Sequence, residues 1–313
     1  MKSKNRNSLG VIFKFAVSLV LALIMQGCAN VPLASAPRLS AAEKMMWSTY
    51  AIATKKGLAT CVVVNRRDPF APHHRIPVLI TAAHVLEAAP QGPFYLVVRR
   101  LNGDESPSVD ILEFAPPAGS VAPFVRHPMH DVAALELHIP PELADSVQLP
   151  SFLDESNVGR AADIPHAGDD VSILGFPHVL PGTLGAFPVL RAGRVASRVQ
   201  GAGADHERLL VNTTAFGGDS GAPVFASSRF GQPKLVGILS ERIGKTEGMV
   251  PLAIALSSSV MRETLQLERE RDRFEVQVGT PEGVPESAGQ KSGVQLLGPP
   301  QPLSKSTIQK LWR

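Results

Sequence analysis

The chain has 313 residues, of which 44% are hydrophobic, 19% are charged and 5% are aromatic, and its formal net charge is +3. This hydrophobic fraction excludes wholesale disorder, and two cysteines are too few for a scaffold held together by disulfides. The 26 glycines and 27 prolines, with many short apolar runs between them, favour an all-β chain with frequent turns.

The first 27 residues have the three-part layout of a secretory signal peptide. Lys2, Lys4 and Arg6 form a positive region, and a mainly apolar stretch follows from residue 11 to residue 25. That stretch is shorter than the roughly 20 apolar residues that a membrane-spanning helix needs. The segment holds four of the chain's positive charges and no negative one, so its removal leaves a net charge of −1. We therefore expect no nucleic-acid partner.

The segment ends in Met25-Gln26-Gly27-Cys28, which resembles the lipobox of bacterial lipoproteins. The resemblance implies that residues 1–27 are removed and that acyl chains on Cys28 anchor the protein to a membrane. Ala29 stands where many lipoproteins kept at the inner membrane have Asp. We therefore expect an exported protein anchored in the outer membrane of the cell envelope, facing the periplasm. The alternative is an ordinary signal peptide followed by an incidental cysteine.

The rest of the chain divides into a spacer (28–46), a β-rich domain (47–275) and a tail (276–313). Within the domain, a stretch with few strand signals separates two β halves, at about 47–150 and 160–258. The predicted strands cover residues 61–64, 78–81, 94–98, 132–137, 171–176, 209–213, 223–225, 235–239 and 250–256.

Two different patterns follow the last predicted strand. Ser259 is a suitable helix cap, and the apolar residues after it are spaced along one helix face, which predicts a helix to about residue 274. The tail is rich in Pro, Gly, Ser, Gln and Glu, so we expect it to be disordered.

Three segments of the domain carry the side chains that acyl transfer requires. His84 follows one predicted strand, Asp131 immediately precedes another, and Ser220 lies in a glycine-rich turn before a third. Together they supply a hydroxyl nucleophile, an imidazole that takes its proton and a carboxylate that fixes the imidazole tautomer. Gly218 gives the turn the freedom to direct the N–H groups of Gly218 and Ser220 towards one point, as an oxyanion hole requires.

These segments resemble those of the trypsin/chymotrypsin-like serine peptidases, especially bacterial members without disulfides, and the resemblance covers about residues 47–265. It rests on Thr81-Ala82-Ala83-His84, Asp131-Val132-Ala133-Ala134-Leu135 and Gly218-Asp219-Ser220-Gly221. The order His, Asp, Ser is also the family's order. The resemblance implies two six-stranded antiparallel β-barrels of the chymotrypsin type followed by a C-terminal helix. It further implies a serine endopeptidase that cleaves proteins or peptides through an acyl-enzyme intermediate and needs no cofactor.

The same resemblance assigns residues for substrate selection. Thr214, six residues before Ser220, corresponds to the floor of the primary pocket, and Ser240 lies on the strand that pairs with the substrate backbone. A neutral Thr214 argues against selection of Arg or Lys and favours a small or medium-sized neutral residue. Because no activation peptide is recognisable, we expect Asp219 to be neutralised by Arg191 or Arg194.

Other interpretations are weaker. An α/β-hydrolase esterase is excluded because its catalytic histidine follows the nucleophile, whereas all nine histidines precede Ser220. His127 and His130 are better explained as part of the loop before Asp131 than as metal ligands, so no metal is expected. Cys61 lies in an apolar run and is expected to be inert. A catalytically silent peptide-binding lipoprotein on the same fold remains the alternative function, and the oligomeric state stays open.

Overall fold

The structure, a computed structural model, consists mainly of antiparallel strands. It describes residues 39–55, 57–68, 75–88, 92–101, 107–116, 123–143, 146–147, 149–177, 187–198, 207–227, 232–243, 251–278, 294–299 and 301–302. The predicted signal peptide, Cys28 and most of the spacer lie outside these ranges. None of the helices within them combines the length and the apolar character needed to cross a membrane.

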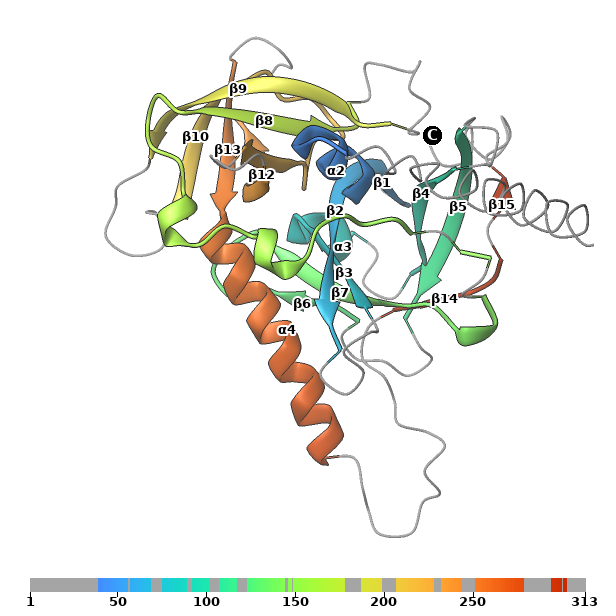
Figure 1. The fold of residues 1–313 in the computed structure, drawn as a ribbon. Coiled ribbons are helices and arrows are strands. Elements are labelled where there is room, and N and C mark those ends of the chain that lie inside the picture. Colours follow the sequence, from blue (N-terminus) through green and yellow to red (C-terminus); the bar gives the residue numbers. More distant parts are fainter. Residues whose placement is uncertain are drawn as a thin grey trace, which may run out of the picture. The chain divides into compact units, whose positions relative to one another are not determined.

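A nine-stranded sheet forms the first half of the fold (Figure 1). Its strands are β1 (Thr49–Thr54), β2 (Gly57–Arg67), β3 (Arg75–Thr81), β4 (Phe94–Leu101), β5 (Pro107–Ala115), β6 (Val125–Arg126), β7 (Ala133–His138), β14 (Val294–Leu296) and β15 (Gln301–Pro302). Their order is β14-β5-β4-β1-β2-β3-β7-β6, with β15 beside β5 and an additional pairing between β14 and β7. Helices α2 (Ala41–Ser48) and α3 (Ala83–Glu87) precede β1 and follow β3.

A closed six-stranded barrel forms the second half. Its strands are β8 (Asp170–Gly175), β9 (Val189–Arg198), β10 (Arg208–Asn212), β11 (Pro223–Ser227), β12 (Pro233–Arg242) and β13 (Leu252–Ser257), in the order β10-β13-β12-β11-β8-β9. The connection between the two halves contains three short 3₁₀ helices, η1 (Pro141–Leu143), η2 (Glu155–Asn157) and η3 (Ala161–Asp163).

Strand β2 shows why the apolar run at residues 61–64 forms a strand buried on both faces. Side chains alternate between the faces of a strand. Cys61 and Val63 accordingly join the core of the first half, whereas Val62 and Val64 join a cluster shared by both halves and the C-terminal helix. Because this shared cluster packs the halves together, residues from both can meet at one site.

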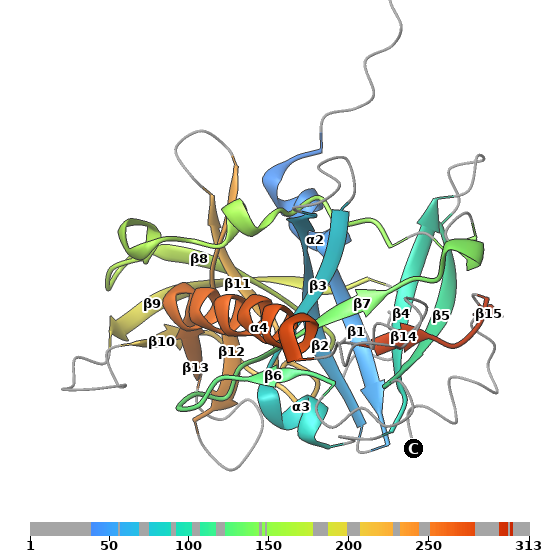
Figure 2. The same ribbon diagram turned by 90° about the horizontal axis from the view of Figure 1, so that it is seen from below.

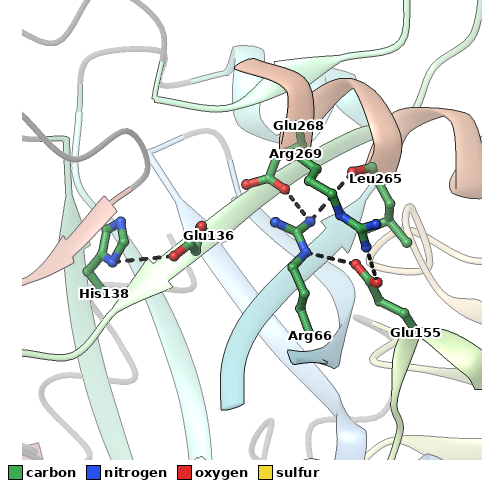
Figure 3. Close-up of polar contacts among 7 residues, drawn as sticks. All are labelled: Arg66, Glu136, His138, Glu155, Leu265, Glu268 and Arg269. Carbon is green, nitrogen blue, oxygen red and sulfur yellow. Dashed lines mark hydrogen bonds and ion pairs between the residues drawn. The ribbon is translucent and has the colours of Figure 1, made fainter. Parts of the chain in front are cut away.

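Helix α4 (Ser258–Val278) contacts β6 and β7 of the first half and β12 and β13 of the second (Figure 2). Buried charges fix its position, as Figure 3 shows. Arg66, near the end of β2, pairs with the fully buried Glu268 of α4 and lies 2.8 Å from Glu155 of η2. Arg269 of α4 pairs with the same Glu155. Helix α4 therefore links the sheet, the barrel and their connection.

The fold class is confirmed: the chain is mostly β, with a closed six-stranded barrel, a second sheet and a C-terminal helix, as in chymotrypsin-like proteins. All nine predicted strands are present. The first half nevertheless has nine strands instead of six, because β1 to β7 make seven and the tail contributes β14 and β15. The expectation of a disordered tail is therefore wrong for residues 276–278, which end α4, and for residues 294–299 and 301–302. Residues 279–293, 300 and 303–313 lie outside the described ranges.

Candidate active site

His84 and Asp131 meet at one end of two neighbouring strands. β3 ends at Thr81, which pairs with Ala133 of β7, so the residues just after β3 and just before β7 lie together. His84 Nδ1 lies 2.7 Å from Asp131 Oδ2, and the His84 backbone N–H donates to Asp131 Oδ1 at 2.9 Å. Both carboxylate oxygens thus contact His84, which fixes the ring and leaves Nε2 directed away from the carboxylate.

The electrostatics of this pair suit a general base. The hydrogen bond with Asp131 raises the pKa of His84 and outweighs partial burial, because about half of the side chain (50%) is exposed. Burial alone would raise the pKa of Asp131, but the hydrogen bonds from His84 and Ser240 hold it below its ordinary value. At neutral pH the carboxylate is therefore ionised beside a ring of increased basicity.

Ser240 supplies a second hydrogen bond to the carboxylate. Its hydroxyl donates to Asp131 Oδ2 at 2.7 Å, and this bond joins β12 of the barrel to the loop before β7. The sequence predicted a substrate-binding role for Ser240, which stays a prediction, and gave no sign of the contact with Asp131. A contact between residues 109 positions apart depends on how the two halves pack.

The turn that contains Ser220 packs against β2. The backbone N–H of Thr60 donates to the Ser220 carbonyl at 2.9 Å, and the Thr60 hydroxyl donates to the Gly218 carbonyl at 2.7 Å. Gly218 (φ 96°) and Gly221 (φ 81°) both have left-handed backbone conformations. A side chain on Gly221 would also overlap Thr60 and Thr81, so this position requires glycine.

The backbone connects Ser220 to the His84–Asp131 pair. The N–H of Gly221 donates to the carbonyl of Leu239 at 2.7 Å, and Leu239 immediately precedes Ser240. Within the described part of the chain, no hydrogen bond joins the Ser220 hydroxyl to His84. The structure thus brings His84 and Asp131 into direct contact and links Ser220 to them through neighbouring residues.

The two predicted oxyanion-hole donors have no protein acceptor among the described residues. Across the described ranges, no protein acceptor takes the backbone N–H of Gly218 or that of Ser220. Gly218 is nevertheless buried. Because buried amides are nearly always paired, two neighbouring unpaired amides in one turn are what an oxyanion site needs.

A buried ion pair supports this turn from the barrel side. Arg191 on β9 holds both oxygens of Asp219, with Nη1···Oδ2 at 2.8 Å and Nη2···Oδ1 at 2.7 Å. Only 3% of the Asp219 side chain is exposed. Any side chain at Gly175 would overlap the Asp219 carboxylate, so this glycine leaves room for the pair. The expectation that an arginine neutralises Asp219 is confirmed, with Arg191 in that role, whereas Arg194 pairs with the exposed Asp170 at the surface.

Thr214 lies beside the same arginine. Arg191 Nη1 donates to the Thr214 carbonyl at 2.6 Å, so the backbone that leads into the Ser220 turn is tied to β9. The Thr214 residue is half-buried. Its role at the floor of a substrate pocket stays a prediction.

Two buried histidines attach the Asp131 loop to its surroundings. His127 Nε2 lies 3.1 Å from Glu263 of α4, and His130 Nε2 lies 3.0 Å from Glu207 before β10. Burial lowers the pKa of His130. Among the described residues, no three potential ligands gather as a metal ion would require.

Cys61 has the properties expected of an inert core thiol. It is a fully buried free cysteine. Burial raises the pKa of its thiol well above the ordinary value, so the reactive thiolate is disfavoured.

The sequence was compared with models of known protein families. Residues 59–238 match the family model described as the trypsin-like peptidase domain. The match covers more than half of the chain and includes His84, Asp131 and Ser220. A comparison with curated proteins produced no match. With its barrel, second sheet and C-terminal helix, the chain belongs to the trypsin-like peptidase domain family.

Proposed function

We propose that the protein is a serine endopeptidase that hydrolyses peptide bonds in proteins through a Ser220–His84–Asp131 triad. The observation that carries the proposal is the hydrogen-bonded group of His84, Asp131 and Ser240, whose last member adjoins the turn that presents Ser220. Membership of a serine peptidase family supports the same reaction class.

The proposed reaction proceeds in two halves. Ser220 Oγ attacks the peptide carbonyl carbon while His84 Nε2 takes the hydroxyl proton, and the N–H groups of Gly218 and Ser220 stabilise the oxyanion. His84 then gives this proton to the leaving amine as the C–N bond breaks, which leaves an ester on Ser220. Water attacks the ester carbonyl while His84 Nε2 takes its proton. The ester C–O bond then breaks as His84 returns this proton to Ser220 Oγ, and the carboxylic product leaves. Asp131 keeps Nδ1 protonated and stabilises the positive ring throughout.

The Arg191–Asp219 pair supports a further part of the proposal. This part is that catalytic activity does not require an amino terminus newly formed by cleavage. The pair already neutralises Asp219 within the barrel. Removal of residues 1–38, which precede the cap of α2, should therefore leave the rate of turnover unchanged. Loss of activity on this trimming, with the fold intact, would contradict the idea.

For specificity, we propose cleavage after a small or medium-sized neutral residue. The neutral Thr214 supports this choice because trypsin-like selection of Arg or Lys uses a buried acid at that position. Cleavage of a peptide library and identification of the new termini test it. A dominant preference for Arg or Lys would contradict it.

We further propose that the chain is exported and lipid-anchored at Cys28 in the outer membrane, facing the periplasm. The supporting feature is the lipobox-like segment that ends at Cys28. Expression in a two-membrane bacterium with an alkyne-tagged fatty acid should label the wild-type protein in the outer-membrane fraction. Cys28→Ala should lose the label, whereas Cys61→Ala should keep it. A label retained in Cys28→Ala would contradict the proposed anchor.

The decisive test of the catalytic proposal uses a fluorophosphonate probe on the mature chain, read as intact mass. We expect one adduct on the wild-type protein and on Ser197→Ala, a control that changes an exposed serine on β9. Ser220→Ala and His84→Ala should give no adduct. Folded wild-type protein that is not labelled would contradict the proposal and favour the silent peptide-binding alternative.

A further inference from the structure

The first half of the fold has an opening between two of its own strands. From β1 to β7 the pairing order runs β5-β4-β1-β2-β3-β7, so β5 and β7 each present an outer edge. Strand β6 covers only the beginning of β7, because Val125 and Arg126 pair with Ala134 and Ala133. The later part of β7 and the whole outer edge of β5 therefore need another partner.

Strand β14, from the far end of the chain, fills this opening. It runs antiparallel to β5, with Leu296 opposite Phe114, and parallel to β7, with Val294 opposite Leu137. Because it pairs on both sides, it closes the ring β14-β5-β4-β1-β2-β3-β7. Figure 1 shows β14 beside the arrowhead end of β5.

Two adjacent leucines, Leu296 and Leu297, differ in how far their side chains are buried. Leu296 is 1% exposed and belongs to the core cluster of the first half, together with Phe114 and Leu137. Leu297 is 60% exposed, although its backbone N–H donates to the Glu113 carbonyl at 3.0 Å. The backbone of the segment thus continues the sheet, and of these two leucines Leu296 is the one whose side chain enters the core.

The segment then rejoins β5 as β15 in a shifted register. Leu296 pairs with Phe114, and Gln301, five residues later in the tail, pairs with Ile111. Ile111 is only three residues from Phe114 along β5, so the register shifts by two residues between the two pairings. The intervening sequence is Gly298-Pro299-Pro300, and β15 itself contains Pro302. Since proline cannot donate to a neighbouring strand, this sequence pattern disfavours the addition of a further strand.

We propose that the opening between β5 and β7 is a strand-acceptor site whose ligand is residues 294–299 and 301–302 of the same chain. Recognition comes from backbone pairing on two sides and from insertion of the Leu296 side chain into the core. The site holds this segment without needing the covalent connection through residues 279–293. The proposal concerns the first half of the fold and is independent of the proposed peptidase activity.

The first experiment cuts the connection after folding. A site-specific protease sequence is inserted between residues 284 and 285 of the full chain, which is folded, cleaved and passed over a size-exclusion column. We expect the released C-terminal fragment to stay with the body of the protein. With Leu296→Asp it should separate, whereas with the matched control Leu297→Asp it should remain. Separation of the wild-type fragment, or equal behaviour of the two variants, would overturn the proposal.

A second experiment needs no cleavage and so covers the case in which the inserted sequence disturbs folding. Hydrogen exchange is followed in the intact wild-type, Leu296→Asp and Leu297→Asp chains. In Leu296→Asp, the amides of β5 and of the end of β7 should exchange at least about tenfold faster, while those of β11 stay unchanged. Leu297→Asp should match the wild type. Equal protection of β5 in both variants would overturn the proposal.

Discussion

The two halves of the fold hold their candidate catalytic groups by different means. The first half holds His84 through side-chain hydrogen bonds at a site where half of the imidazole is exposed. The second half holds the Ser220 turn through left-handed glycines, backbone hydrogen bonds and the buried Arg191–Asp219 pair.

This difference follows from what each group has to do. A general base must exchange protons and works best with a pKa near the operating pH, so contact with water and one strong partner suit it. An oxyanion site works because its donors are fixed in advance, so burial and rigid anchoring suit the turn. Changes at the base should therefore alter chemistry and pH dependence, whereas changes beneath the turn should alter stability as well.

The largest effect is expected for the nucleophile. Ser220→Ala should lower turnover by about 10⁴–10⁶-fold, because it removes the attacking oxygen. The thermal unfolding temperature should stay close to the wild-type value, because no hydrogen bond of the Ser220 hydroxyl is formed within the described residues. Steady-state kinetics and thermal unfolding measure the two quantities. Turnover within tenfold of wild type would show that another group carries the reaction.

The next largest effect concerns the base and its pH dependence. In the proposed mechanism the neutral form of His84 is the active one. Its pKa is raised above the ordinary value of 6.5, so activity should fall as the pH drops through a point above 6.5. Asp131→Asn should cut turnover by about 10⁴-fold. It should also shift the fall in activity to lower pH, because the carboxylate that raises the pKa of His84 is gone. Probe labelling rates across pH measure the shift. If activity fell at the same pH in Asp131→Asn as in the wild type, a group other than His84 would be the one that titrates.

The two arginines of β9 form a matched pair of variants for stability. Arg191→Met leaves the buried Asp219 without its cation and should cost about 3–5 kcal/mol of unfolding free energy. Arg194→Met removes a surface pair with Asp170 and should cost about 0–1 kcal/mol. Urea unfolding measures both values. Equal losses would show that the buried pair is not what supports the turn.

The smallest expected effect concerns Thr60, which would position the oxyanion donors without taking part in the reaction itself. The buried Thr60 hydroxyl donates to the Gly218 carbonyl and accepts from the Phe176 N–H at 3.2 Å. Thr60→Val should cost about 1–3 kcal/mol of transition-state stabilisation, seen in kcat more than in KM, because the oxyanion donors lose part of their support. Thr60→Ser keeps the hydroxyl and should restore turnover. Equal kcat for the Val and Ser variants would rule out this role.

Much of this arrangement could be predicted from local sequence. Apolar runs located nine strands, and short motifs singled out His84, Asp131 and Ser220. The choice between Arg191 and Arg194 could not be made in this way, because no strand was predicted at residues 189–198. In the structure of β9, Arg191 shares the inward face with Val195, whereas Arg194 faces solvent.

The rest depends on contacts between distant parts of the chain. The Ser240–Asp131 hydrogen bond requires the packing of the two halves, for which no local pattern exists. Strand β14 has only three residues, and its flanking Gly and Pro residues are typical of disorder. Its strand conformation is imposed by edges that lie about 160–180 residues earlier in the sequence, which a composition argument cannot detect.

The position of β14 also sets the timing of folding. In a chain that is made from its amino terminus, β1 to β7 emerge early, but β14, the strand that closes their sheet, emerges only after β8 to β13 and α4. Pairings of such large sequence separation form slowly, because a long loop must close before they contribute any stability. The sheet that carries His84 and Asp131 is therefore closed only after the strands of the barrel have emerged.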